Sequence, residues 1–221
     1  MALLAHDLRN PLSAVLTNIT FIQSSMRGRA PDLDDALSDC TLSCAMLGQV
    51  LANLDIISRA FAPGTASKQP TSVRRLAEEA AARFAPHGAM NGVAIEVVPS
   101  SADPVVLVEP VFFGRALENL IVNALQYSPS QGVVHIECAE SAEEGSISVV
   151  DDGPAVPPEL RALAVAPDWQ GEAKLRYEAR YGRGLGLFCA TEAARFAGAE
   201  VTLSGRAGRS ALELAAPLAS R

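Results

Sequence analysis

Two patterns of hydrophobic spacing divide the chain. Over residues 1–60, apolar or small residues recur at alternating intervals of three and four, the heptad spacing of helices that pack along a narrow seam. The pattern breaks at 27–32, where Gly28 can end one helix and Asp32 can cap the next. We therefore expect an antiparallel helical hairpin. Because a lone hairpin buries little surface, we expect two copies to form a dimeric four-helix bundle.

The pattern changes after residue 60. Residues 61–70 lose the heptad spacing and contain Pro63, Gly64 and Pro70, so we expect a linker there. Residues 71–221 mix helical and alternating segments without a strict strand–helix–strand repeat, which favours an α+β two-layer sandwich with helices on one face of a mixed sheet. The predicted helices span 72–84, 111–127 and 185–196, and the predicted strands span 93–98, 105–108, 133–139, 146–150, 200–204 and 210–215.

Composition narrows the class of protein. With 221 residues, 49% of them hydrophobic and 19% charged, the chain is too apolar to be disordered, and no apolar run is long enough for a membrane span. The net charge of −7 argues against a nucleic-acid partner. The four cysteines are scattered without a CxxC motif, so we expect reduced thiols and a cytoplasmic location.

The first candidate for chemistry is His6. Asp7 follows it, and Asn10 lies on the same helical face at i, i+4 spacing. Pro11 interrupts the same predicted helix and should bend it. Asp7 is suited to hold the imidazole tautomer that leaves one ring nitrogen available for nucleophilic attack.

The segment His6 to Leu12, with the sequence HDLRNPL, resembles the H-box of the two-component sensor histidine kinases. In that family a dimeric helical hairpin carries the phospho-accepting histidine, and an attached domain binds ATP. The resemblance implies that His6 is phosphorylated, that Asp7 orients it or takes its proton, and that Asn10 can orient a water for the reverse, phosphatase reaction.

Asn119 and Asn123 lie on one face of a predicted helix, again at i, i+4 spacing. Each amide offers an uncharged oxygen to a hard cation, and neutral ligands suffice for Mg²⁺ when a triphosphate supplies the negative charge. The surrounding segment, residues 117–129, resembles the N-box of the same family. The resemblance implies that Asn119, Asn123 and Tyr127 contact the nucleotide.

Two glycine-containing motifs follow. The strand ending in Asp151 and Gly153 resembles the G1 box, which implies that Asp151 accepts a hydrogen bond from the adenine amine. Glycines at the start of a helix let backbone amides approach a phosphate. The glycines of the segment YGRGLGL resemble the G2 box, and the implied phosphate-binding positions are Gly182, Gly184 and Gly186.

The chain also departs from the family pattern. Ala155 stands where the G1 box has its second glycine, Gln126 stands where a lysine is common, and the phenylalanines of the lid motif are missing. These changes are expected to lower nucleotide affinity or turnover. Only five residues precede His6, so we expect either a truncated chain or a protein without a sensor, and we favour truncation. The missing sensor could be membrane-bound, although the residues present make no membrane contact.

The four motifs imply an ATP-binding fold shared with the Hsp90 chaperones, and a kinase that uses ATP and Mg²⁺. We expect autophosphorylation of His6, a homodimer through residues 1–60, and transfer of the phosphoryl group to a response-regulator aspartate. The alternative is a histidine phosphotransferase or pseudokinase relay with a degenerate ATP-binding domain. A third possibility, an Hsp90-like ATPase, would release phosphate independently of His6.

Overall fold

The computed structural model divides the chain into two compact units, Met1–Ser58 and Arg59–Arg221. Every described residue of the first unit is helical, in keeping with the predicted helices. The turn at 27–32 lies outside the described residues, and the dimeric bundle stays a prediction. The structure describes residues 13–15, 17, 18, 21, 22, 36, 40, 44, 47–51, 53, 54, 56, 67–100, 102–154, 186–206 and 209–220.

The second unit is an α+β fold. Its described helices are α3 (Val73–Met90), α4 (Pro110–Tyr127) and α7 (Gly186–Ala197). Its described strands are β1 (Gln69–Ser72), β2 (Ala94–Val97), β3 (Val105–Val108), β4 (Val133–Glu140), β5 (Glu144–Pro154), β6 (Glu200–Arg206) and β7 (Arg209–Pro217).

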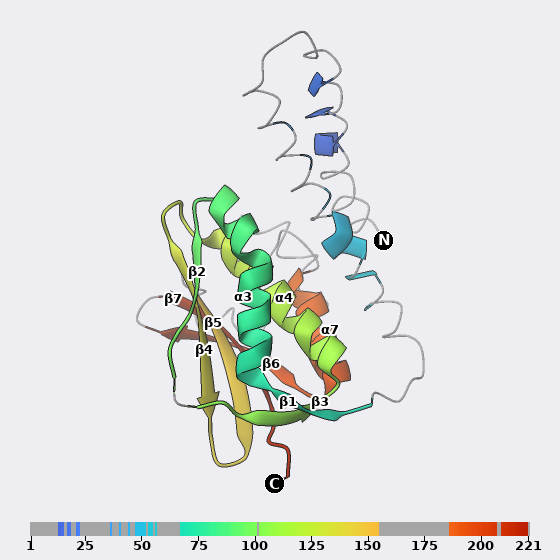
Figure 1. The fold of residues 1–221 in the computed structure, drawn as a ribbon, viewed down its shortest axis with the longest axis vertical. Helices are drawn as coiled ribbons and strands as arrows, with labels where there is room; N and C mark the ends of the chain where they lie inside the picture. The colour runs from blue at the N-terminus through green and yellow to red at the C-terminus, as the bar shows by residue number, and fades with distance from the viewer. Residues whose placement is uncertain are drawn as a thin grey trace, which may run out of the picture. The chain divides into compact units, whose positions relative to one another are not determined.

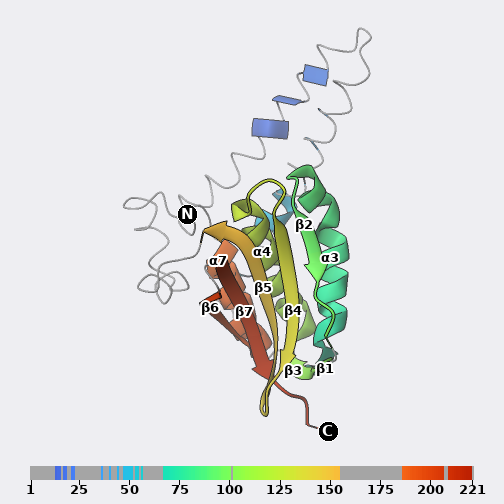
Figure 2. The ribbon, with the colours of Figure 1, turned by 90° about the vertical axis from the view of Figure 1, so that its left-hand side faces the viewer.

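The main sheet has the strand order β2-β4-β5-β7-β6, in which β2 and β4 are parallel and the other neighbours are antiparallel. All three helices lie on one face of this sheet (Figures 1 and 2). The predicted two-layer α+β architecture with a mixed sheet is therefore confirmed.

The core lies between the sheet and the helices. In β4, buried and partly exposed residues alternate, as the two-residue period of a strand requires, whereas the central strand β5 is buried without interruption from Gly145 to Asp151. Helix α4 lies deepest, and α7 packs closely against it through buried alanines. The main core side chains are Val134, Ile136, Ile147, Val149, Leu212 and Leu214 from the sheet, Phe113, Leu117, Leu120 and Ile121 from α4, and Ala190, Ala193, Ala194 and Ala197 from α7.

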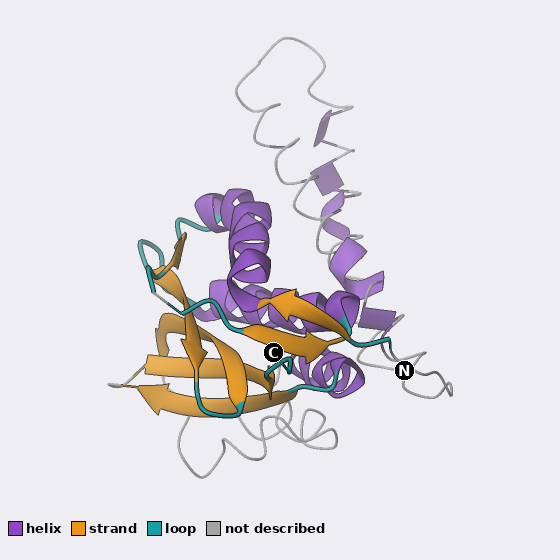
Figure 3. Ribbon diagram, turned by 60° about the horizontal axis from the view of Figure 1, so that its bottom comes forward, coloured by secondary structure: helices purple, strands orange, loops and turns teal. Residues whose placement is uncertain are grey.

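A second, two-stranded sheet is formed by β1 and β3, which pair antiparallel from Gln69↔Val108 to Ser72↔Val105 (Figure 3). Strand β1 begins inside the stretch 61–70 that the sequence marks as linker. Pro70 lowers the strand propensity of this segment, but a proline is tolerated in a strand that pairs on one side only. The pairing partner lies more than thirty residues away, so local sequence carries no signal for it.

The ends of several elements differ from the predicted ones. Helix α3 continues past Phe84 through Pro86 to Met90, where Asn91 caps it. A proline near the end of a helix removes only one backbone hydrogen bond, and the helix here continues into a last turn. Strand β5 extends to Pro154 because its pairing with β7 resumes after an irregularity at Asp151.

Among the described residues, no helix is both long enough and apolar enough to span a membrane. All four cysteines are reduced thiols. Cys138 faces the core from β4, and burial raises the pKa of its thiol.

Two glycines provide a test of this packing. A Cβ on Gly145 would lie 2.7 Å from Pro104 Cβ and 2.8 Å from Val106 Cγ1, whereas no atom of the described residues lies within 4 Å of a Cβ on Gly114. We expect Gly145→Ala to lower the free energy of unfolding by about 1–3 kcal/mol, because Pro104 and strand β3 must move to make room for the added methyl group. Gly114→Ala, in the interior of α4, should raise it by up to about 1 kcal/mol. Urea unfolding of both variants measures the contrast, and equal effects would contradict the packing described.

Candidate functional site

Three elements of the second unit carry the described candidate residues. Helix α4 provides Asn119, Asn123 and the half-buried Tyr127, and β5 ends with Asp151 and Gly153. Helix α7 begins at Gly186, and α4 packs against both α7 and β5. The other candidates, His6, Asp7, Asn10, Gly182 and Gly184, lie outside the described residues.

The start of helix α4 is set by Glu109 and Pro110. The carboxylate of Glu109 accepts a hydrogen bond from the Phe112 amide at 2.8 Å, which caps the helix, and Pro110 takes the first helical position. The helix then runs through the core, so that Asn119 is 2% exposed and Asn123 is 9% exposed. Two amide side chains are thus held on a rigid, buried element.

The side-chain amide of Asn119 has a fixed orientation. Its Nδ2 donates to the backbone carbonyl of Arg115 at 2.9 Å, which directs Oδ1 away from that turn of the helix. A Cβ on Gly186 would lie 3.8 Å from this Oδ1. The amide oxygen of Asn119 therefore faces the first residue of α7, where the glycine backbone is not covered by a side chain.

Asn123 differs from Asn119 in one important respect. Its Oδ1 is buried and has no hydrogen-bond partner among the described residues. A buried acceptor without a partner costs about 1–3 kcal/mol, so such atoms call for an explanation. An absent ligand that binds to oxygen would provide one.

The donor set fits a hard cation that brings most of its own ligands. The described residues contain no group of three or more His, Cys, Asp or Glu side chains that could hold a metal ion. The amide oxygens of Asn119 and Asn123 are neutral, hard ligands, which suit Mg²⁺ when other oxygens come from a bound phosphate and from water.

The end of β5 presents a buried carboxylate. Asp151 is 1% exposed, and its Oδ1 accepts a hydrogen bond from the Gly153 amide at 2.8 Å. The pairing with β7 shifts between Asp151 and Pro154. Ser210, which lies opposite Asp151 and is fully buried, donates from Oγ to the Pro154 carbonyl at 3.2 Å. This irregular strand end therefore has a defined conformation.

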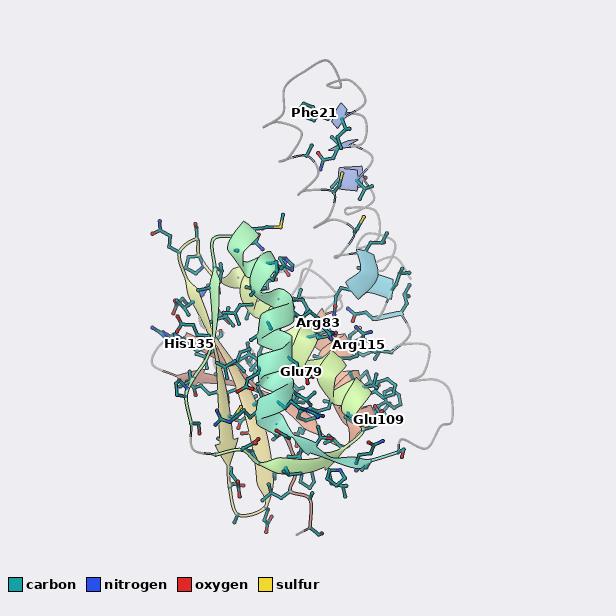
Figure 4. All side chains as sticks on the ribbon, viewed as in Figure 1. Phe21, Glu79, Arg83, Glu109, Arg115 and His135 are labelled. Carbon is teal, nitrogen blue, oxygen red and sulfur yellow. The ribbon has the colours of Figure 1, made fainter. Side chains whose placement is uncertain are left out.

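The positions of several residues around the site could not be predicted from the sequence. Ser210, Asp152 and Arg209 meet at the irregularity only because of the strand register. Glu118, next to Asn119, has a side chain that is 9% exposed and contacts both Arg83 of α3 and Arg115 of α4. Figure 4 labels these two arginines. These ion pairs connect α3 to the turn of α4 that carries Asn119.

Removing the Glu118 carboxylate should loosen this connection. We expect Glu118→Gln to lower the free energy of unfolding by about 1 kcal/mol, since both arginine partners are partly exposed and water screens the pairs. Glu79, whose 60% exposed side chain pairs with Arg75 at 3.7 Å, provides a matched control. Glu79→Gln should change the value by less than about 0.5 kcal/mol in urea unfolding. Equal losses for the two variants would contradict a special role for Glu118.

Several known proteins are similar to this chain in sequence. The model of the family described as histidine kinase-, DNA gyrase B-, and HSP90-like ATPase matches residues 108–219. The sensor protein IrlS of Burkholderia pseudomallei is 28% identical over 185 residues, which are 83% of this chain and 39% of the relative. The sensor protein CreC of Escherichia coli is 25% identical over 90% of this chain and 41% of its own length. The chain thus spans about two fifths of the length of these curated relatives.

Solved structures share the fold. Full-length ShkA in complex with AMPPNP superposes with a TM-score of 0.64 at 23% identity, covering 100% of this chain and 46% of that one. The histidine kinase ThkA in complex with the response regulator protein TrrA gives a TM-score of 0.64 at 16% identity, covering 97% of this chain and 60% of that one.

Proposed function

The chain belongs to the histidine kinase-, DNA gyrase B-, and HSP90-like ATPase family, and from this premise we propose that it is the ATP-dependent protein-histidine kinase core of a two-component system. A ring nitrogen of His6 attacks the γ-phosphorus of ATP. The bond from that phosphorus to the bridging oxygen breaks, and ADP leaves. The phosphoryl group then passes to an aspartate of a response-regulator receiver.

The observation that supports this proposal most directly is the buried Oδ1 of Asn123, which has no hydrogen-bond partner in the described part of the chain. Asn123 and Asn119 would hold Mg²⁺ through their amide oxygens. When bound, the cation would neutralise charge on the nucleotide phosphates. Phosphoryl transfer depends mainly on positioning and charge neutralisation, and a helix fixed in the core provides the first of these.

Other residues would bind the adenine base and the phosphates. Asp151 accepts a hydrogen bond from the exocyclic amine of adenine, since an ionised carboxylate is an acceptor with several lone-pair positions. The backbone at Gly182, Gly184 and Gly186 binds phosphate oxygens at the start of α7, where the helix dipole favours negative charge.

We assign the acceptor chemistry to the first unit. Asp7 orients His6 or takes its proton, and Asn10 orients a water for the phosphatase reaction. We further propose a homodimer through residues 1–60 and a response-regulator partner. Two findings support the partner: the curated relatives are named sensor proteins, and ThkA is described in complex with a response regulator.

Labelled ATP tests the kinase. Incubation of the chain with γ-labelled ATP and Mg²⁺ should produce an acid-labile label on the protein, and His6→Gln should abolish it. His135, on β4 and in contact with Glu96 at 3.9 Å, provides a control, and His135→Gln should retain the label. ADP binding without any label would point instead to a phosphotransferase or pseudokinase relay. Phosphate release that His6→Gln leaves unchanged would indicate an ATPase.

The cation site has a separate test. We expect Asn123→Ala to weaken binding of ADP in the presence of Mg²⁺ by about tenfold or more, as the loss of a contact essential to a metal site does. The free energy of unfolding without nucleotide should fall by less than about 1 kcal/mol, because Oδ1 makes no hydrogen bond in the described part of the chain.

Asn91, whose Nδ2 donates to the His87 carbonyl at the exposed end of α3, provides the matched control. Asn91→Ala should leave ADP affinity unchanged in the same titration calorimetry. An Asn123→Ala variant that binds ADP with unchanged affinity and unchanged Mg²⁺ dependence would remove Asn123 from the site.

A further inference from the structure

The irregularity at the end of β5 leaves a short piece of backbone outside the regular sheet. Asp151 pairs with Ser210, and the next pair is Pro154 with Arg209. Asp152 and Gly153 therefore have no counterpart on β7. An irregularity of this kind bends a strand and redirects its side chains, and such features are common beside functional sites. The conformation of this piece must depend on interactions other than the strand ladder.

The side chain of Asp152 supplies such interactions. Its Oδ2 accepts a hydrogen bond from the Val133 amide, the first residue of β4, at 3.0 Å. Its Oδ1 lies 3.3 Å from Nε of Arg209, the first residue of β7. One carboxylate thus connects β5 to both neighbouring strands, directly after the buried Asp151.

Charge gives Arg209 a second effect. Asp151 and Asp152 are adjacent carboxylates, and Asp151 is nearly inaccessible to water. The guanidinium of Arg209 offsets the charge of Asp152, whose side chain is 27% exposed. Arg209 therefore pairs with the carboxylate that directly follows Asp151 in the strand.

We propose that Asp152 and Arg209 form a positioning clamp that holds the Asp151 carboxylate in place for an adenine base. The clamp residues act through the strand backbone, so they are positioning residues for base recognition. This inference rests on the proposed function, because it assumes that Asp151 accepts the adenine amine. It adds two residues that determine base affinity without belonging to the phosphate side of the site.

Two probes separate the base from the phosphates. ADP carries adenine, whereas inorganic tripolyphosphate has no base. With Mg²⁺ present, we expect Arg209→Ala and Asp152→Asn in the full chain to weaken ADP binding by about fivefold, the equivalent of about 1 kcal/mol. Binding of tripolyphosphate should stay within about twofold of the wild type, a loss of less than about 0.5 kcal/mol, because this probe has no base to contact Asp151.

Conservative and control variants sharpen the test. Arg209→Lys keeps the charge opposite Asp152 and should recover much of the ADP affinity. Arg75→Ala removes another exposed arginine with an acidic partner, Glu79, far from β5 in the sequence, and should affect neither probe. In the chain without nucleotide, Arg209→Ala should also speed hydrogen exchange at the Gly153 amide, which donates to Asp151.

The contrary results are distinct. Equal weakening of ADP and tripolyphosphate would mean that the clamp supports the fold rather than the base site, and unchanged ADP affinity would mean that it has no such role. Either result overturns the clamp while leaving the kinase proposal intact. A wild-type chain that binds no ADP at millimolar concentration would reject the proposed function, and the role of the clamp with it.

Discussion

The burial of α4 is the constraint on which the rest of the site depends. Its apolar residues anchor it between the sheet and the other helices, so the polar side chains that it carries are fixed in the interior. A buried polar group must find a partner or reduce stability. The Nδ2 of Asn119 has its partner in the Arg115 carbonyl, which fixes that side chain, whereas the buried Oδ1 of Asn123 has no partner within the described residues. One helix can therefore both stabilise the fold and carry an amide oxygen that is suited to a ligand.

Much of this arrangement follows from the sequence. The spacing of apolar residues predicts α4 to within one residue, and the i, i+4 spacing places both asparagines on one face. Four short motifs indicate the sensor histidine kinases, and that family resemblance is confirmed. These successes share a cause: helical periodicity and contiguous motifs are local properties of a chain.

The features that sequence reasoning missed depend on contacts between distant segments. Strand β1 exists because β3 pairs with it, and Glu118 is buried because Arg83 of another helix approaches it. Ser210 lies opposite Asp151 only through the register of β5 and β7. A carboxylate in an amphipathic helix is usually solvated, so nothing local distinguishes Glu118. The predicted acceptor residues His6, Asp7 and Asn10 stay predictions because they lie outside the described part of the chain.

The proposed cation side and the proposed base side of the site are built on different elements, and this separation has a physical consequence. The cation side depends on α4, a rigid helix whose position is set by core packing. The base side depends on the end of β5, where the sheet ladder is interrupted and side chains such as Asp152 fix the backbone instead. Interactions of exposed side chains are weaker than core packing, so the base side is easier to alter by substitution. Base affinity can therefore change in this fold without disturbing the asparagines that would hold the metal.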